Sequence, residues 1–216
     1  MAGRIWMLVV LILSVSGCVS VVDGAAVRGW SDDVEQILLS DRRLNELLGS
    51  REIDTTQVFH EMTDETDDIS HPECVGAIYT AEEPMYADTG YTAVQTRIGS
   101  EPGEYYVHWV QQTAVIVPTA EVAAEFVDQT AQVWQDCAGT TVTVDDGDVG
   151  YDWQLQQIDR RDGVLSQLST DPEFGDWGCQ HAMGAVSTVI VEALVCSERI
   201  DEEARTLVAE ILANAG

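Results

Sequence analysis

The cysteines constrain the fold of this chain more than any other feature of its sequence. There are five of them, Cys18, Cys74, Cys137, Cys179 and Cys196. The first lies in an apolar N-terminal stretch, and the other four are spread over the rest of the chain. Whether these four form disulfide bonds depends on the compartment in which the chain folds, so the N-terminus has to be interpreted first.

The N-terminal stretch predicts an export signal. Arg4 supplies a positive charge, residues 5–13 form a short apolar run, and small residues follow. The run is shorter than the roughly 20 residues that a membrane-spanning helix needs. The sequence VSGC at residues 15–18 resembles the bacterial lipobox, so we expect cleavage before Cys18 and attachment of acyl chains to its thiol. We therefore assign residues 1–17 to a lipoprotein signal peptide and residues 18–30 to a tether.

An exported chain folds in an oxidising compartment, where the remaining four cysteines predict two disulfides. Four cysteines allow three pairings, and spacing alone does not select one of them. Cys179 and Cys196 flank two apolar stretches that meet at residues 187–188, so an antiparallel hairpin turning there would bring them side by side. We therefore predict sequential pairing, Cys74 with Cys137 and Cys179 with Cys196. A zinc site fits less well, because the sequence has no CxxC and its histidines lie far from the cysteines.

The charge of the chain limits its partners. It has 38 Asp and Glu against 10 Arg and no Lys, and its formal net charge is −28. It lacks the clustered basic residues that nucleic-acid binding requires, and an acidic membrane surface would repel it. Its apolar content of 45% is nevertheless well above that of charged disordered chains. We therefore expect residues 31–216 to fold as one domain.

The hydrophobic pattern predicts a mixture of helices and strands. Three segments repeat apolar residues at a helical spacing: 34–48, 121–137 and the stretch from about 201. Others alternate or form short apolar runs, as strands do: 91–98, 105–117, 140–144, 151–158, 164–169 and the hairpin 179–196. The acidic segment 61–73 is predicted to be a solvated loop. The pattern predicts one α+β domain with an antiparallel sheet.

Several predicted strands carry polar but mostly uncharged side chains, which suit hydrogen bonds to a neutral polar ligand such as a cell-envelope glycan. These residues are Gln95, Arg97, Tyr106, His108, Gln112, Gln154, Gln156 and Gln167. From this set we select Tyr106, His108, Arg97 and Gln112 as candidate ligand-binding residues. The alternative interpretation is the ordinary solvated face of an antiparallel sheet.

No motif in the sequence predicts an enzyme, a metal or a cofactor. The four histidines do not form an HExxH pair, and no GxSxG elbow surrounds Ser166 or Ser187. The acidic segment 145–148 lacks the glycine and glutamate that a calcium loop needs at its sixth and twelfth positions. We therefore predict a domain without catalytic, metal-binding or cofactor-binding residues. A hydrolase of unrecognised geometry is the less favoured alternative.

Several short motifs follow one another in a fixed order: HPxCxG at 71–76, Tyr86, VIVP at 115–118, WxxC at 134–137, WxCQ at 177–180 and the apolar strand closing at Cys196. In this order they resemble the extracytoplasmic sensor domain of the mycobacterial PknH-type receptor serine/threonine kinases, a family that includes free-standing lipoproteins. The resemblance implies a twisted antiparallel sheet with packed helices, sequential disulfides and a cleft for an unidentified ligand. The chain departs from the family in its last hairpin, where Thr188-Val189 and Glu192 replace a common Asn-Val turn and an Asp.

Together these features predict a lipid-anchored, extracytoplasmic ligand-binding or sensor domain on the outer face of an actinobacterial cytoplasmic membrane. Its expected partners are a small or glycan-like envelope ligand, the membrane through the lipid anchor, and a receptor kinase or another envelope protein. The alternative is a structural or protein-interaction lipoprotein whose acidic surface contacts basic partners.

Overall fold

The computed structural model describes residues 33–216, apart from residues 104, 146 and 148. The predicted signal peptide, the tether and the lipid attachment at Cys18 lie outside the described residues. Within the described part, no helix is both long enough and apolar enough to cross a membrane.

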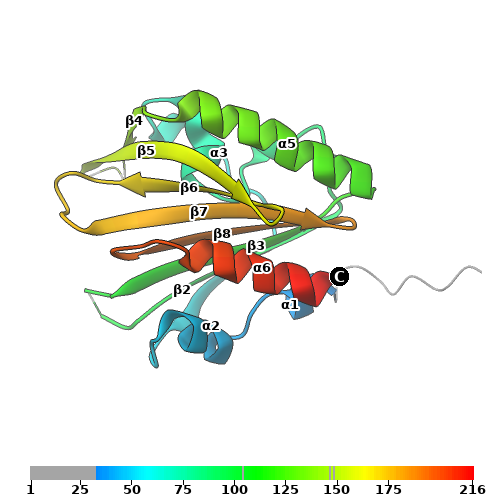
Figure 1. Cartoon of the computed structure of the whole chain (residues 1–216), viewed down its shortest axis with the longest axis horizontal. Coiled ribbons are helices and arrows are strands. Elements are labelled where there is room, and N and C mark those ends of the chain that lie inside the picture. Colours follow the sequence, from blue (N-terminus) through cyan, green and yellow to red (C-terminus); the bar gives the residue numbers. More distant parts are fainter. Residues whose placement is uncertain (1–32, 104, 146, 148) are drawn as a thin grey trace, which may run out of the picture.

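A single eight-stranded antiparallel sheet organises the domain, with the strand order β1-β2-β3-β8-β7-β6-β5-β4. Figure 1 shows the strong twist of this sheet. The strands are β1 (Asp54–Phe59), β2 (Ala93–Ser100), β3 (His108–Ile116), β4 (Thr141–Asp145), β5 (Gly150–Arg161), β6 (Val164–Thr170), β7 (Trp177–Val186) and β8 (Val189–Glu198). The predicted α+β class with a twisted antiparallel sheet is confirmed.

Helices pack on both faces of the sheet. α3 (Val75–Ile78), α4 (Glu83–Tyr86) and α5 (Ala120–Cys137) lie on one face, which we call the α5 face. α1 (Asp33–Ile37), α2 (Asp41–Leu48) and α6 (Glu203–Ala215) lie on the other, the α6 face. Two short 3-10 helices, at Thr66–Asp68 and Pro72–Cys74, interrupt the acidic loop that precedes α3.

Strand alternation divides the apolar side chains between two cores. On β8, Ile190 packs into the core under α5, whereas Val191 and Val195 pack into the core under α6. All three are fully buried. A central strand that is covered on both faces has no side that faces solvent. The sequence of β8 is therefore an almost continuous apolar run and does not alternate.

α5 is fixed at both ends. The Thr119 side chain accepts a hydrogen bond from the Val122 N–H at its start, which is a common N-cap arrangement. Near its end, the buried indole N–H of Trp134 donates to the Gly76 carbonyl at 2.7 Å. One turn later Cys137 is joined to Cys74 by a disulfide.

Both disulfides have the predicted pairing, Cys74–Cys137 and Cys179–Cys196. In the last hairpin Cys179 lies directly opposite Cys196, and the chain turns between Val186 and Val189 as the apolar stretches indicated. The second disulfide therefore links two neighbouring strands at the centre of the sheet.

The structure also contains elements that the periodicity did not predict. β1 is an edge strand that pairs only with β2, and most of its side chains are exposed. An edge strand whose two faces are both exposed to solvent needs no alternation of apolar residues. The polar sequence of β1 therefore gave no periodicity from which a strand could be predicted.

β5 is longer than the sequence pattern predicted. It continues to Arg161, three residues beyond the predicted end, and the chain turns at Asp162-Gly163, where both residues have positive φ.

Removing either disulfide should lower the free energy of unfolding, and the loop length should rank the two effects. The Cys74–Cys137 loop spans 63 residues and the Cys179–Cys196 loop 17. Chain entropy then gives losses of about 4 and about 3 kcal/mol, respectively. Urea unfolding of C74A/C137A and C179A/C196A measures both. A larger loss for C179A/C196A would show that the disulfide acts through native packing and not through loop closure.

Candidate functional site

An aromatic cleft opens at one end of the α5 face, beyond the ends of α3 and α5. Its volume is about 210 Å³. The lining side chains are Ile78, Tyr79, Tyr106, Trp109, Val144, Trp153, Ser169, Trp177, Leu194 and the Cys179–Cys196 disulfide. None of them carries a charge, although the chain as a whole has a formal net charge of −28.

The sheet register brings the aromatic side chains together. Trp109 on β3 lies opposite Cys196 on β8, and Cys196 lies opposite Cys179 on β7. Their side chains share the α5 face, so the disulfide forms the floor of the cleft between them. Trp177 at the start of β7 and Trp153 on β5 complete the walls. Three of the four tryptophans in the described part of the chain line this cleft, and the fourth is the core residue Trp134.

Tyr79 closes the cleft on the α3 side. Burial, followed by the nearby acids Glu65, Asp68 and Glu82, raises the pKa of Tyr79 to about 12. Its phenol therefore stays neutral at any physiological pH. The polar groups on the side chains that line the cleft are thus uncharged.

The predicted ligand residue Tyr106 lies in this cleft, with its ring centroid 6.0 Å from that of Trp177. Its loop is held by Glu101, whose carboxylate accepts from the Val107 and His108 N–H groups at 3.1 and 2.7 Å. The predicted residue His108 is part of the same support, because its Nδ1 lies 2.7 Å from Glu101 Oε1. His108 is therefore engaged in positioning the β2–β3 loop.

The hydrogen bonds that hold this loop also keep the Glu101 carboxyl group ionised. Burial opposes its ionisation, but hydrogen bonds from the His108 side chain, the His108 backbone and the Ser50 hydroxyl outweigh the burial and lower its pKa to about 2. A carboxylate with several donors is held in its charged form. The loop that carries Tyr106 is thus anchored at neutral pH.

Two other predicted residues, Gln112 and Arg97, lie on the α6 side of the sheet, away from the cleft. The Gln112 amide is fully buried and bonds both the N–H and the carbonyl of Leu39 at 2.8 Å. This corrects our selection of Gln112 as a ligand contact, because both of its polar atoms are occupied in the fold. Arg97 donates to the Glu35 carbonyl at 3.1 Å and lies in a shallow groove beside Gln95. The four selected residues do not form one surface, because Arg97 and Gln112 are cross-strand partners on the α6 face, whereas Tyr106 precedes β3 and its loop carries it to the cleft.

Other glutamines of the predicted polar face are likewise buried. Gln167 donates to the carbonyls of Trp134 and Gln156, and Gln95 is only 4% exposed. Gln154 stays exposed. The polar strand residues therefore serve mainly internal contacts, which the prediction of a solvated or ligand-binding sheet face did not foresee.

Behind the cleft, a buried carboxylate joins the helices of the α5 face to the sheet. Glu192 Oε1 accepts from the Tyr86 hydroxyl at 2.6 Å and from the Ala81 N–H at 3.2 Å, and its Oε2 lies 3.1 Å from His181 Nε2. His181 Nδ1 faces the Ala77 carbonyl at 3.3 Å and must donate to it, because a carbonyl only accepts. Ala81 adopts a left-handed conformation (φ 59°) that directs its N–H at the carboxylate.

This network has no access for a substrate. Tyr86, His181 and Glu192 are each at most 2% exposed, and the space beside them holds no water-sized cavity. Burial, and then the Glu192 charge, raise the pKa of Tyr86 well above its usual range, so its hydroxyl remains a donor. We interpret the network as a structural link, because a reacting group would have to be reachable.

Glu82 is a second buried carboxylate in the same region. Its side chain accepts from the Thr63 hydroxyl at 3.1 Å and from the Glu65 N–H at 2.9 Å. Burial raises the pKa of Glu82 to about 7, with small contributions from the charges of Glu65 and Glu192, although the two hydrogen bonds act in the opposite direction. Among the described residues, no group of three or more His, Cys, Asp or Glu could hold a metal ion.

Comparisons with known proteins agree on the family. The model of the PknH-like extracellular domain matches residues 31–214. The chain is 36% identical over 176 residues to the serine/threonine-protein kinase PknH of Mycobacterium tuberculosis and 35% identical to that of Mycobacterium bovis. These alignments cover 82% of this chain but 28% and 30% of the kinases, so the chain spans less than a third of their length.

A solved structure has the same fold. The crystal structure of the extracellular domain of PknH from Mycobacterium tuberculosis superimposes with a TM-score of 0.80 at 34% identity. The match covers 85% of this chain and 94% of that one.

Sequence reasoning placed only Tyr106 of its candidates in the cleft and missed the tryptophans that form it. A usable signal was present, because Trp109, Trp153 and Trp177 all lie on predicted strands or next to a predicted disulfide. Their convergence could not be predicted from the local pattern, because it depends on β3 pairing with β8, a strand far later in the chain, as well as with β2.

The raised pKa of Glu82 predicts a pH-dependent stability. The folded state binds the proton more tightly than the unfolded chain, whose pKa is near 4.5. This contribution to stability is therefore fully present below about pH 4.5 and is lost as the pH rises towards 7, by about 3 kcal/mol in total. Urea unfolding between pH 4 and 8 should show this slope in the wild type, and E82Q should lack it. The exposed residue Glu125 provides the control E125Q, and parallel profiles for E82Q and the wild type would contradict the assignment.

Proposed function

Because this chain belongs to the PknH-like extracellular domain family, we propose that it is an exported, non-catalytic domain whose aromatic cleft binds a ligand outside the cytoplasm. The sensor role of such a domain implies a signalling partner. A receptor kinase, or another envelope protein, is the partner class that its relatives suggest.

The observation that carries this proposal is the uncharged aromatic cleft. Three tryptophans and two tyrosines converge on about 210 Å³ in a strongly acidic protein. Partly exposed aromatic walls with a few hydroxyls are typical of ligand sites, since most of their lining is apolar and a few polar groups fix orientation. The buried Glu192 network, by contrast, offers no opening for a ligand.

The lining indicates the chemical class of the ligand. No side chain in the cleft compensates a negative ligand charge, so an anionic group would lose its hydration without gaining a partner. A neutral ring whose apolar face stacks on Trp109, Trp153 or Trp177 and whose hydroxyls meet Tyr79, Tyr106 or Ser169 fits these walls. A sugar ring of an envelope glycan has this chemistry.

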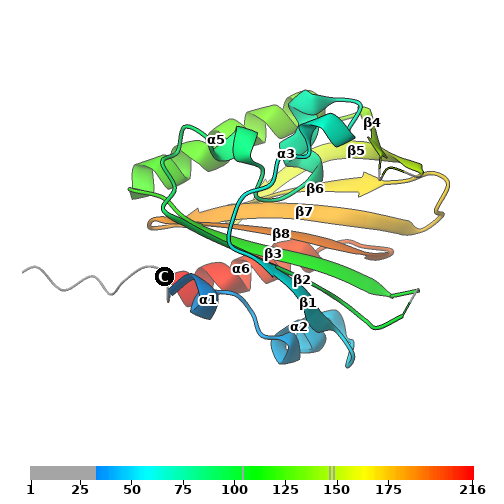
Figure 2. The same ribbon diagram turned by 180° about the vertical axis from the view of Figure 1, so that it is seen from behind.

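The position of the cleft suits a domain held at its N-terminus. α1, the first described helix, lies at the end of the sheet opposite the loops that connect β2 to β3 and β6 to β7, as Figures 1 and 2 both show. The cleft residues Tyr106 and Trp177 lie at those loops. We propose that Cys18 carries the lipid anchor on the outer face of the cytoplasmic membrane and that residues 18–30 connect it to the domain. The anchored end and the ligand end are then separate.

Substitution of a cleft tryptophan should remove ligand binding without unfolding the domain. Trp177 is partly exposed at the mouth of the cleft, so W177A should cost little stability. We expect neutral methyl glycosides to quench or shift wild-type tryptophan fluorescence and W177A to bind at least about tenfold more weakly, which is 1.4 kcal/mol. Fluorescence titration and a melting curve measure both. If no glycoside in a panel of hexose and pentose forms binds the wild type, the ligand class is wrong.

The lipid anchor has its own test. In an actinobacterial host grown with an alkyne analogue of palmitate, the wild type should incorporate the label and C18S should not. S20A is the matched control, because it lies two residues after Cys18, leaves every cysteine in place and should keep the label. Label retained on C18S, or absent from the wild type, would contradict attachment at this residue.

A further inference from the structure

The exposed apolar residues of the described chain are concentrated at one end of the molecule. Six large apolar side chains are exposed, and five of them lie on three loops: Tyr105, Tyr106, Val107, Val149 and Phe174. We call these five residues the apolar tip. The sixth, Val58, lies on the edge strand β1. Such a grouping of exposed apolar residues marks an interaction site more often than scattered single residues do.

The three loops adjoin one another and the cleft. They connect β2 to β3, β4 to β5 and β6 to β7, and Figures 1 and 2 place them at the same end of the sheet. Two ring contacts connect neighbouring loops at this end of the sheet. The ring centroid of Tyr106 lies 6.0 Å from that of Trp177, and the ring centroid of Phe174 lies 5.7 Å from that of Tyr151 at the start of β5. The apolar tip therefore meets the aromatic walls of the cleft at Tyr106, which belongs to both.

Exposure in the apolar tip is large. Tyr105 is 89% exposed, and Val107 and Phe174 are 58% and 50% exposed. A purely polar ligand in the cleft would leave these side chains in water. A ligand with an apolar extension would cover them, and covering apolar surface is favourable in proportion to its area.

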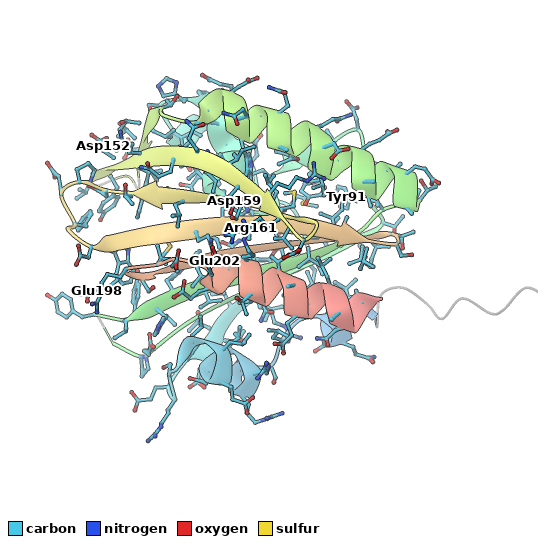
Figure 3. All side chains as sticks on the ribbon, in the orientation of Figure 1. Tyr91, Asp152, Asp159, Arg161, Glu198 and Glu202 are labelled. Carbon is cyan, nitrogen blue, oxygen red and sulfur yellow. A yellow bond between two sulfur atoms is a disulfide. The ribbon has the colours of Figure 1, made fainter. Side chains whose placement is uncertain are left out.

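The charges around the apolar tip restrict the rest of the ligand. Among the described residues of these loop ends, the exposed carboxylates are those of Asp145, Glu173, Asp176 and Glu198, and the exposed basic side chain is that of Arg199. Figure 3 shows Glu198 projecting at this end. An anionic headgroup would be repelled here, which agrees with the sugar-like, neutral head inferred for the cleft.

From these observations we propose that the ligand is an uncharged-headed amphiphile, whose sugar-like head stacks in the aromatic cleft and whose aliphatic chain lies across the apolar tip. The inference rests on the proposed function for the position of the head, and it adds the chain and its path. Val107 and Phe174 are the predicted chain contacts, and Trp177 is the predicted head contact.

The test is a chain-length series on the folded wild-type domain, with isothermal titration calorimetry of methyl, hexyl and octyl β-D-glucopyranoside below their micelle concentrations. A fully buried methylene strengthens binding about fourfold. A chain on an open surface keeps about half of that free energy, so we expect about twofold per methylene and about a hundredfold between methyl and octyl. Octyl sulfate provides an anionic head and 1-octanol a chain without the sugar, and both should bind at least tenfold more weakly than octyl glucoside.

Matched variants locate the chain. V107S/F174S should bind methyl glucoside as the wild type does and lose most of the gain from methyl to octyl. V58S removes the exposed valine on β1 and should behave as the wild type throughout. W177A should weaken every member of the series.

The outcomes separate the two proposals. Equal binding of methyl and octyl glucoside would overturn the chain and leave the glycan cleft standing. Equal binding of octyl glucoside, octyl sulfate and octanol would overturn the uncharged head. A chain-length gain that persists in V107S/F174S, or that is lost in V58S, would overturn the path across the apolar tip. No binding of any member would overturn this inference, and the glycoside panel with W177A would then decide the proposed function independently.

Discussion

The antiparallel pairing of β7 with β8 is the interaction on which the rest of this structure depends. These two strands lie at the centre of the sheet and are covered on both faces, so one set of their side chains supports α5 and the other supports α6. The same register places Cys179 against Cys196 as the floor of the cleft and brings His181 within reach of Glu192. Core, cleft and buried network therefore share one hairpin.

The buried polar residues explain why a sheet rich in glutamine is not a solvated surface. Gln112 and Gln167 bond backbone groups of Leu39, Trp134 and Gln156, which would otherwise be buried without partners. Each such bond avoids the cost of an unpaired buried polar group. Polarity in a strand is thus compatible with either water or an internal partner, and only the arrangement of neighbouring segments distinguishes them.

The cleft and the buried network have different chemistry although α3 borders both. The cleft is open, aromatic and uncharged, whereas the network is closed and contains paired ionisable groups. Binding needs the first kind of environment, because a ligand must enter and lose little hydration. Structural linkage needs the second, because a carboxylate without access to water holds Tyr86, Ala81 and His181 in one arrangement. The crystal structure that shares this fold is that of the extracellular domain of PknH from Mycobacterium tuberculosis.

The sequence by itself determined the α+β class, most strand and helix positions, the paired cysteines and the turn of the last hairpin, because periodicity, turns and cysteine count are local properties of the chain. The polar edge strand β1 escaped it, since an exposed strand has no apolar alternation. Only the tertiary structure decided that Trp109, Trp153 and Trp177 meet while Gln112 is buried on the other face. Strand order depends on contacts between residues that are distant in sequence, and the exposure of a side chain depends on the segments that pack over it. Neither can therefore be predicted from the local sequence pattern.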